Sequence, residues 1–330
     1  MKSFKCAIVG ATGMVGSMFA QILAERKLPI DNLYLFASAR SAGQTVEFEG
    51  RELAIEELVP EVFDRGIDMA LFATENDVSK IYAPIATKKG CIVVDNSSAW
   101  RLDPDVPLVV PEVNGSDIAW HKGIIANPNC CAVPAVIALN PLHQKFGVRR
   151  VVISTYQSVS GAGVNGWRDL TDTLAGMPPK HFPYTIANNV IPHIDRFGDD
   201  GYTGEEKKLI AETRKMLHSP DMKITATTVR VPVYTGHSLS INVSLENYFE
   251  LAEVRSLLSA APGVVLMDDP ANNVYPVPTM AAGTDLVYIG RVRRDDSFEN
   301  SLNLWVVVDN VRKGAATNAV QIAEMVMCGQ

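Results

Sequence analysis

The chain has 330 residues, of which 47% are hydrophobic and 20% are charged, a composition typical of an ordinary globular protein. A chain of this length is expected to divide into two domains, because single cores stop growing near roughly 250 to 300 residues. The formal net charge of -7 argues against a nucleic-acid or anionic-membrane surface, and no apolar run approaches membrane-spanning length. We therefore expect a cytoplasmic protein with a small-molecule substrate, no nucleic-acid partner and no membrane partner.

The five cysteines do not indicate a disulfide framework or a metal centre. Their number is odd, two of them are adjacent, and they show no Cys-x-x-Cys or Cys/His ligand spacing. Such cysteine usage fits a reducing compartment. Because the cysteines and histidines show no ligand spacing, the sequence predicts no bound metal.

In the first part of the chain, short apolar strands alternate with helical stretches. The predicted strands cover residues 5–9, 33–36, 69–72, 91–95 and 123–126. Strands that alternate with helices pair in parallel, so this pattern predicts an α/β domain with a doubly wound sheet of Rossmann type.

A glycine-rich turn follows the first predicted strand and opens the first helix. It runs from Gly10 to Gly16, and its glycines let backbone N–H groups approach a pyrophosphate at the helix N-terminus. A tight turn without a ligand is the alternative, but the position on the first βα unit favours dinucleotide binding. The residues expected to contact the dinucleotide here are Gly10, Thr12, Gly13, Met14 and Val15.

The end of the second predicted strand indicates which dinucleotide binds. An NAD site normally has Asp or Glu there to bind the ribose 2′-OH, whereas residues 37–41 read Ala-Ser-Ala-Arg-Ser. Hydroxyl groups and a guanidinium suit a 2′-phosphate, so we expect NADP, with Ser38, Arg40 and Ser41 near that phosphate. Arg40 could instead be a solvated surface arginine, but the missing acid favours NADP independently of it.

The turn Asn127-Pro128-Asn129-Cys130 lies between an apolar stretch and a helical run at residues 132–139. It would place Cys130 at a helix N-terminus, where free N–H groups and the positive dipole end favour a thiolate. The same N–H groups could bind the oxyanion that forms when a thiolate adds to a carbonyl carbon. An isolated cysteine is more often a small buried hydrophobe. Here the Asn-Pro-Asn turn before Cys130 favours the interpretation of this cysteine as a nucleophile.

The second part of the chain has a different pattern. Longer strand-like runs cover residues 148–159, 224–233, 238–245, 286–292 and 302–308, and they alternate apolar and polar residues over much of their length. This alternation predicts a largely antiparallel sheet with one face covered. Helical spacing follows at residues 205–217 and 311–327, and residues 182–202 have the composition of a long loop.

We expect the last helix to pack on the first domain. The predicted division is therefore an NADP-binding domain of residues 1–129 and 311–330, and an α+β catalytic and dimerisation domain of residues 130–310.

One face of the second sheet is expected to lack helical cover within one chain. Residues such as Val151, Ile153, Val243 and Leu304, or their neighbours, would lie on it and would be covered by a second copy across a two-fold axis. The connection at residues 161–202 is the alternative cover.

Several motifs occur together in one order along the chain. They are Gly10 to Gly16, residues 96–101 (Asn-Ser-Ser-Ala-Trp-Arg), residues 127–130, residues 156–163 (Tyr-Gln-Ser-Val-Ser-Gly-Ala-Gly), residues 230–233 with His237, and residues 309–316. With these motifs the chain resembles aspartate-semialdehyde dehydrogenases from end to end. The resemblance implies reduction of L-4-aspartyl phosphate by NADPH to L-aspartate 4-semialdehyde with release of phosphate, a step in lysine, methionine and threonine synthesis. It also implies a homodimer or homotetramer.

The resemblance implies a role for each matching residue. Cys130 would be the nucleophile and His237 its acid-base partner, which titrates in the useful pH range. Arg101 and Lys208 would bind the phosphate, Arg230 the α-carboxylate, Glu205 the amino group, and Gln157 the acyl group. Ser160, Gly161 and Asn310 would line the nicotinamide side of the cofactor. Glu205 and Lys208 could instead form an exposed ion pair, and either arginine a salt bridge.

Two positions depart from the family pattern. Residues 73–77 read Ala-Thr-Glu-Asn-Asp where a small glycine-rich turn is usual, which places Glu75 and Asp77 near the expected cofactor phosphates. Cys131 follows the nucleophile where serine or threonine is usual. It could be a buried, inert thiol, which we favour, or it could trap an oxidised Cys130.

Two alternative functions remain at this point. One is a related acyl-phosphate reductase that acts on N-acetylglutamyl phosphate, although Asn129 differs from the glycine those enzymes have before the cysteine. The other is a non-enzymatic NADP-binding paralogue, which the presence of Cys130, Gln157, Arg230 and His237 argues against.

Overall fold

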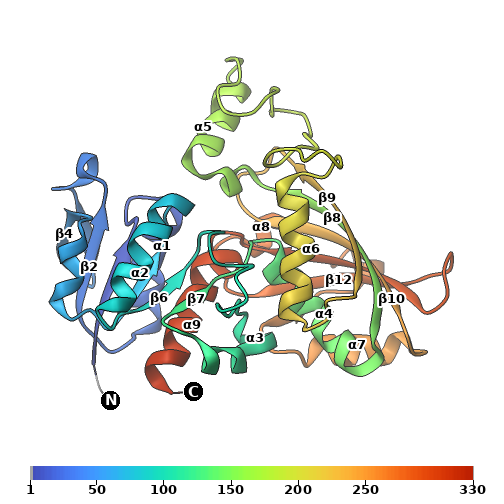
Figure 1. Ribbon diagram of the computed structural model, residues 1–330. Helices are drawn as coiled ribbons and strands as arrows, with labels where there is room; N and C mark the ends of the chain where they lie inside the picture. The colour runs from blue at the N-terminus through green and yellow to red at the C-terminus, as the bar shows by residue number, and fades with distance from the viewer. Residues whose placement is uncertain (1–2, 330) are drawn as a thin grey trace. The chain divides into compact units, whose positions relative to one another are not determined.

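The computed structural model describes residues 3–329. The chain divides into two compact units (Figure 1). The first comprises the chain up to Pro128 together with the chain from Ala315 onward, and the second is Asn129–Gly314.

The first unit is built on a seven-stranded sheet with the order β3-β4-β2-β1-β5-β6-β7. All neighbours pair in parallel except β3 and β4, as a doubly wound sheet requires. The elements of this unit are β1 (Phe4–Val9), α1 (Met14–Arg26), β2 (Ile30–Ala37), η1 (Ala39–Ser41), β3 (Thr45–Phe48), β4 (Arg51–Glu57), η2 (Pro60–Arg65), β5 (Met69–Phe72), α2 (Asn76–Lys88), β6 (Ile92–Asp95), α3 (Pro111–Asn114), η3 (Gly115–Trp120), β7 (Ile124–Ala126) and α9 (Thr317–Cys328).

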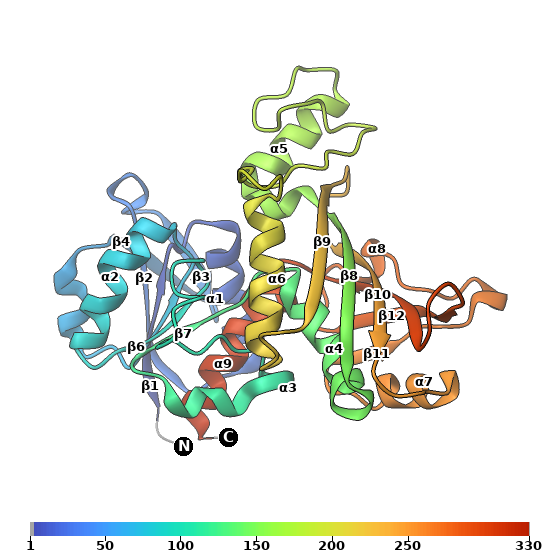
Figure 2. The same cartoon turned by 45° about the vertical axis from the view of Figure 1, so that its right-hand side comes forward.

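Helices cover both faces of this sheet. Cys6 and Ile8 of β1 pack into one core with residues of α1 and α9, while the alternate residues Ala7 and Val9 are buried on the opposite face. Helix α2 contacts η2 there, and Phe63 of η2 packs against Phe36 and Phe72 of the neighbouring strands. Figure 2 shows α2 and α9 in this unit. Burial on both faces explains why the strand sequences are continuously apolar. The C-terminal helix α9 contacts α1, β5 and β6 of the same unit.

The hairpin of β3 and β4 was not predicted from the sequence. Its two strands are joined by Glu49 and Gly50, with φ angles of 48° and 74°. Positive φ at both positions is the geometry of a type I′ hairpin turn, which suits the twist of the flanking strands. The strands are half exposed and rich in charged residues, so the apolar periodicity that reveals a strand is weak here.

The second unit contains a six-stranded sheet with the order β11-β12-β13-β10-β8-β9. The sheet is largely antiparallel, as predicted, but mixed, because β8 pairs in parallel with β9 and β11 in parallel with β12. The elements are α4 (Ala132–Phe146), β8 (Val148–Gln157), η4 (Val159–Ala162), α5 (Gly163–Leu174), α6 (Gly204–Met216), β9 (Lys223–Arg230), β10 (His237–Leu245), α7 (Leu251–Ser259), β11 (Val264–Leu266), η5 (Pro270–Asn272), α8 (Pro278–Ala281), β12 (Val287–Asp295), β13 (Ser301–Val308) and η6 (Arg312–Ala316).

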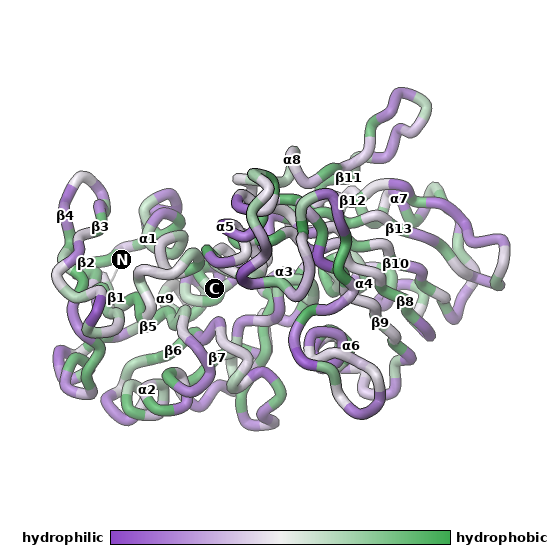
Figure 3. Tube along the Cα trace, turned by 90° about the horizontal axis from the view of Figure 1, so that it is seen from above, coloured by the Kyte–Doolittle hydropathy of each residue, from purple (hydrophilic) through white to green (hydrophobic). Residues whose placement is uncertain are grey.

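One face of this sheet is covered from within the same chain. Helix α4 contacts β8, β10, β12 and β13, α6 contacts β9, and α7 contacts β11 and β12. Hydrophobic and hydrophilic positions are interspersed along the strands (Figure 3). The alternation predicted from the sequence is therefore present.

Of the residues expected on the uncovered face, Val151, Ile153, Val243 and Leu304 do not lie there, whereas their neighbours do. All four are at most 1% exposed, and they point to the helix-covered face. Their neighbours form the other face, because successive strand residues point to opposite sides. These neighbours include Val152, Tyr156, Ser240, Asn242 and Trp305.

Residues 182–202 contain no helix or strand, only isolated bridges such as the pairing of Ile191 with Arg230. Within the described residues, no helix is long and apolar enough to span a membrane.

Candidate active site

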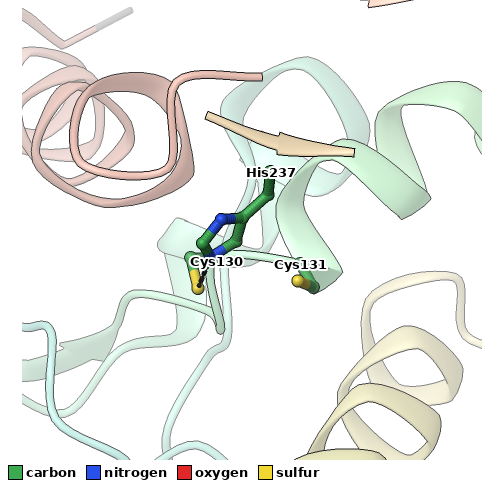
Figure 4. A group of neighbouring side chains, drawn as sticks. All are labelled: Cys130, Cys131 and His237. Atoms are coloured by element: carbon green, nitrogen blue, oxygen red, sulfur yellow. Dashed lines mark hydrogen bonds between the residues drawn. The ribbon is translucent and has the colours of Figure 1, made fainter. Parts of the chain in front are cut away.

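Two side chains from distant parts of the second unit come into contact. Cys130 Sγ lies 3.3 Å from His237 Nε2 (Figure 4). Cys130 is partly exposed and precedes α4, whereas His237 is fully buried at the start of β10. A thiol beside an imidazole is the arrangement of a cysteine nucleophile with an acid-base partner.

The far side of the His237 ring faces Ser158. The Ser158 backbone N–H donates to His237 Nδ1 at 3.1 Å, and the Ser158 hydroxyl lies 3.1 Å from the same atom. The backbone N–H suits an unprotonated Nδ1, and the hydroxyl can accept a hydrogen bond from a protonated one. The backbone N–H therefore suits the tautomer with hydrogen on Nε2, whereas the hydroxyl suits the tautomer with hydrogen on Nδ1, whose Nε2 can accept a proton.

Asn310 fixes this serine in place. Its Oδ1 accepts hydrogen bonds from Ser158 Oγ, Ser160 Oγ and the Gly236 backbone N–H, each at 3.0 Å. Asn310 is 3% exposed. The amide oxygen thus ties together the η4 turn and the turn before β10, the segments that hold His237.

The pKa of the Cys130 thiol lies well below its usual value. The largest cause is a hydrogen bond with the Cys131 thiol; burial opposes the shift, and the charge and hydrogen bond of His237 and the charge of Arg230 support it. Burial raises the pKa of Cys131 well above the usual value, and Cys131 is fully buried. Cys130 is therefore the thiol that ionises.

Asn129 caps the helix that follows the nucleophile. Its Oδ1 accepts from the N–H groups of Cys131 at 2.8 Å and Ala132 at 3.4 Å, and its carbonyl oxygen accepts from Val133 N at 3.1 Å. The N–H groups of Cys131, Ala132 and Val133, which could bind an oxyanion, are thus paired with Asn129 in the structure, and oxyanion binding at this helix stays a prediction. The cysteine lies at the helix N-terminus as predicted, one residue before the N-cap Cys131.

A buried arginine lies beside this cluster. Arg230, at the end of β9, is 4% exposed, and its Nη1 donates to the Ser158 carbonyl oxygen at 2.7 Å. Its Nε has no hydrogen-bond partner in the structure. A Cβ atom at Gly161 would lie 2.7 Å from Arg230 Nη1 and 3.1 Å from the His237 ring. Glycine at this position therefore allows both side chains to approach.

A second polar group surrounds the Glu205 carboxylate. Its Oε1 accepts from Asn129 Nδ2 at 2.8 Å and from Gln157 Nε2 at 3.3 Å. Gln157 ends β8 and Glu205 lies in the first turn of α6, and both are buried. Together they place an amide and a carboxylate beside the turn that holds Cys130.

Lys208 has a different partner from the one that spacing suggested. Its Nζ contacts Asp195 Oδ2 at 2.6 Å, and its side chain is 31% exposed. Helical spacing alone made Glu205 a possible partner, but Glu205 bonds to Asn129 and Gln157 instead.

The first unit contains a cavity of about 620 Å³ above the glycine-rich turn. Among the residues predicted to bind the dinucleotide, Gly10, Thr12, Gly13, Ser38 and Arg40 line it, whereas Met14, Val15 and Ser41 do not. The other residues that line it are Ala37, Ala39, Glu57, Leu58, Ala73, Thr74, Glu75, Val78 and Tyr82.

This cavity suits a dinucleotide. Gly10 has a φ of 90°, and a Cβ atom there would lie 2.4 Å from the Ala73 carbonyl oxygen, so glycine is required by the fold itself. At Gly13, in contrast, a Cβ atom would meet only Gly10 O, at 3.5 Å, so its absence leaves space for a ligand. Thr74 Oγ1 is buried without a hydrogen-bond partner and belongs to a lining residue.

The acidic residues near the cavity differ from the sequence expectation. Glu75 lines it, as the departure from the family pattern suggested, while Asp77 does not. Glu57 also lines it from the end of β4, where it pairs with Ala37 of β2. No acid stands at the end of β2, but Glu57 supplies one at the end of the adjacent strand β4. The order of residues in the sequence did not reveal that these two strands are neighbours.

The loop that carries Arg101 is held by a buried carboxylate. Asp95, which is fully buried, accepts from Ser97 N at 2.6 Å and from the Ser79 hydroxyl. Trp100 Nε1 donates to Ser79 Oγ at 2.8 Å and so joins the same set of hydrogen bonds. Arg101 is 8% exposed, and its Nη2 donates to the Asn96 carbonyl oxygen at 2.8 Å.

Comparison with known proteins gives a consistent result across the chain. Residues 5–121 match the family model "Semialdehyde dehydrogenase, NAD binding domain", and residues 139–313 match "Semialdehyde dehydrogenase, dimerisation domain". The aspartate-semialdehyde dehydrogenase of Aquifex aeolicus is 51% identical over 333 residues, with 98% of each chain covered. That of Bacillus subtilis is 46% identical, with 96% of each chain covered.

The chain belongs to the aspartate-semialdehyde dehydrogenase family.

Solved structures of this family agree with the fold. The chain is similar to the crystal structure of aspartate semialdehyde dehydrogenase II from Vibrio cholerae, with a TM-score of 0.94, 42% identity and 99% of each chain covered. It is also similar to the enzyme from Candida albicans solved with NADP, with a TM-score of 0.79, 26% identity and 99% of each chain covered.

Of the residues assigned by the family resemblance, the second unit brings Cys130, Gln157, Glu205, Arg230 and His237 into one connected set of contacts. Ser160 and Asn310 join it through Ser158, and Gly161 lies against Arg230 and His237. Ser158 and Asn129 were in the quoted motifs but had no assigned role. Their contribution depends on hydrogen bonds to residues far along the chain, which a motif does not display.

Proposed function

We propose that this protein is an NADPH-dependent reductase of L-4-aspartyl phosphate that releases L-aspartate 4-semialdehyde and phosphate, as its membership of the aspartate-semialdehyde dehydrogenase family implies. The observation that supports this most strongly is the contact of 3.3 Å between Cys130 Sγ and His237 Nε2, with the lowered pKa of Cys130. Acyl phosphates react readily with a thiolate, and the product is a thioester on the enzyme.

In the first step, the tautomer of His237 that carries hydrogen on Nδ1 donates it to Ser158 Oγ and accepts the Cys130 proton at Nε2. The thiolate attacks the acyl carbon, a carbon–sulfur bond forms, and the carbon–oxygen bond to phosphate breaks. Phosphate leaves and takes up a proton. When bound, NADPH supplies the hydride that reduces the thioester. Collapse of the resulting thiohemiacetal expels the Cys130 thiolate, which His237 stabilises, and releases the aldehyde.

The charges of the site suit a small, doubly anionic substrate. We assign Arg230 to the α-carboxylate because its guanidinium is buried and its Nε has no protein partner. We assign Glu205 to the substrate amino group and Gln157 to orientation of the acyl group. Arg101 and Lys208 are assigned to the phosphate by the family match, with Lys208 leaving Asp195 to do so.

We propose that Gly10, Thr12, Gly13, Ser38 and Arg40 hold NADP in the cavity of the first unit. Met14 and Val15, which begin α1, and Ser41, whose N–H donates to Ser38 O at 2.8 Å, would support this site from beside it. Ser160, Gly161 and Asn310 would contribute on the nicotinamide side.

The decisive assay is the reverse reaction, in which NADPH formation is followed with phosphate, NADP and an aldehyde. Aspartate semialdehyde should support it and N-acetylglutamate semialdehyde should not. The Cys130→Ser variant should lose at least about a thousandfold in kcat while it still binds NADP, because a hydroxyl is a far weaker nucleophile than a thiolate. Equal turnover of the two aldehydes would contradict the substrate assignment, and an active Cys130→Ser variant would contradict the nucleophile.

Cofactor preference provides a separate test. Arg40→Ala should lower the preference for NADP over NAD by about one to two orders of magnitude, because a charge-assisted hydrogen bond contributes roughly 1.5 to 3 kcal/mol. Lys27→Ala, which also removes one positive charge but lies outside the lining of the cavity, is the matched control. Unchanged affinities for both cofactors would place the 2′-phosphate elsewhere.

We further propose a homodimer formed through the uncovered face of the second sheet, with a tetramer as a pair of dimers. The match to a dimerisation-domain model over residues 139–313 supports this. We place the activity in the cytoplasm, where the Cys130 thiol would remain reduced.

A further inference from the structure

The nucleophile, its neighbouring thiol and the catalytic imidazole form one compact set of potential ligands. The Cys130 and Cys131 sulfur atoms and a ring nitrogen of His237 all lie within 4.8 Å of one another (Figure 4). Among the residues that the structure describes, this is the only group of three Cys, His, Asp or Glu side chains with such spacing. We propose that it is an inhibitory site for a soft divalent cation such as Zn²⁺, in which Cys131 is the ligand that completes the set.

The ligand atoms lie close enough for an ion to draw them together, since all three are within 4.8 Å of one another. Zn–S bonds near 2.3 Å and Zn–N bonds near 2.0 to 2.1 Å place ligand atoms about 3.5 to 3.8 Å apart. The observed separation of 3.3 Å between Cys130 Sγ and His237 Nε2 is within a few tenths of an ångström of that value. Water would occupy the fourth position on the partly exposed Cys130 side.

The charge and the surrounding hydrogen bonds also suit zinc. Two thiolates and a neutral imidazole around a divalent ion give no net charge, which a buried position next to Cys131 can accommodate. A metal-bound histidine usually donates its other ring N–H to a fixed acceptor. Here His237 Nδ1 lies 3.1 Å from Ser158 Oγ, which in turn lies 3.0 Å from Asn310 Oδ1. Nδ1 also accepts from the Ser158 backbone N–H at 3.1 Å, so zinc binding would replace that hydrogen bond by one from Nδ1–H to Ser158 Oγ.

Zinc binding and catalysis would exclude each other. Binding displaces the thiol protons of Cys130 and Cys131, forms two Zn–S bonds and one Zn–N bond, and involves no oxidation or reduction. It occupies the sulfur lone pair that attacks the acyl carbon and the Nε2 atom that accepts the proton. The sequence predicted no metal because His237 lies 107 positions from Cys130.

The test measures metal binding directly, so it does not depend on the proposed function. Purified, reduced protein is titrated with Co²⁺ and Zn²⁺ in competition with a chromophoric chelator. Wild type should bind one ion per chain, with Co²⁺ giving thiolate-to-metal charge-transfer bands and the visible bands of a tetrahedral site. Bound Zn²⁺ should protect Cys130 from iodoacetamide and should be removed by EDTA.

Cys131→Ser should weaken Zn²⁺ binding by at least about 100-fold, since even the loss of an outer partner costs 10- to 100-fold. Cys91→Ser, which removes a buried thiol from β-sheet packing in the first unit, should bind as wild type does. If Cys131→Ser proves misfolded by circular dichroism, His237→Gln should show the same loss. Equal Zn²⁺ affinity in wild type and the ligand variants, or Co²⁺ spectra without charge-transfer bands, would overturn the proposal.

Discussion

At the scale of single residues, the protonation of Cys130 distinguishes it from the other described cysteines. Its pKa is lowered, chiefly by Cys131 and His237, whereas burial raises the pKa of Cys6 to about 12. A lowered pKa keeps the thiolate populated as the pH falls, until the pH passes below that pKa. The rate of alkylation by iodoacetamide should therefore stay high at pH 7, where an ordinary thiol with a pKa near about 8.5 is mostly protonated.

Mass spectrometry of the alkylated protein should find the label on Cys130 alone among the described cysteines, at neutral pH and short times. A rate that falls in proportion to hydroxide concentration below pH 8.5 would show that Cys130 has an ordinary pKa.

Asn310 is a positioning residue in the structure, and its removal should affect both stability and turnover. Asn310→Ala leaves Ser158 Oγ, Ser160 Oγ and the Gly236 N–H without their shared acceptor. A buried donor without a partner costs about 1 to 3 kcal/mol, and the two hydroxyls can still pair with each other, so we expect a loss of about 2 to 4 kcal/mol in the free energy of unfolding.

Urea denaturation measures that loss, and kcat should fall more than KM changes because His237 loses its fixed orientation. Asn303→Ala is the control. Its Oδ1 accepts one half-buried bond, from Asn242 at 3.1 Å, and it should lose less than about 1.5 kcal/mol with kcat intact. Unchanged kcat in Asn310→Ala would show that the network does not position His237.

At the scale of elements, α6 is fixed by the capping box at its first turn. Thr203 Oγ1 accepts from Glu206 N at 3.3 Å, and Glu206 Oε2 accepts from Thr203 N at 2.8 Å. Glu206 Oε1 also accepts from Thr228 N at 3.0 Å, which joins the helix to β9. Since the same turn carries Glu205, the cap determines where a proposed substrate ligand lies.

Thr203→Ala should lower the free energy of unfolding by about 1 kcal/mol and raise KM for aspartate semialdehyde, because the first turn of α6 loses its cap. Thr203→Ser retains the hydroxyl, so its free energy of unfolding and its KM should stay close to those of wild type. Thermal unfolding and steady-state kinetics measure the two effects. If KM is unchanged in Thr203→Ala, the cap does not determine the position of Glu205.

At the scale of the whole molecule, the uncovered face of the second sheet is the surface for which we propose a second copy. It carries Val152, Tyr156 and Trp305, and the rings of the last two lie 5.4 Å apart. Val152→Asp should place a carboxylate at the centre of that face and convert the dimer to the 35.9 kDa monomer at micromolar concentration, as measured by sedimentation.

Val164→Asp adds the same charge at a position on α5 that is 51% exposed, and it should leave the dimer intact. A dimer that persists in Val152→Asp and is lost in Val164→Asp would place the interface on the segment around α5.

Much of the fold could be predicted because it rests on local patterns. The buried strands of the first sheet are continuously apolar, and those of the second alternate, so their positions followed from periodicity within a few residues. The hairpin of β3 and β4 was missed for the same reason, since its half-exposed, charged strands lack that signal. The choice of sheet face stayed open, because period-2 alternation separates two faces without telling which one the helices cover.

By itself, the sequence determined the glycine-rich turn at Gly10, the position of Cys130 before a helix, and the family. These depend on neighbouring residues and on motif order. Only the tertiary structure decided that Asn129 occupies the N–H groups expected to bind an oxyanion, and that Ser158 and Asn310 hold His237. Only the structure placed Cys131 in a metal-binding geometry. Such contacts join residues separated by up to 152 positions, and the register of β8, β10 and β13 brings them together, which no local pattern specifies.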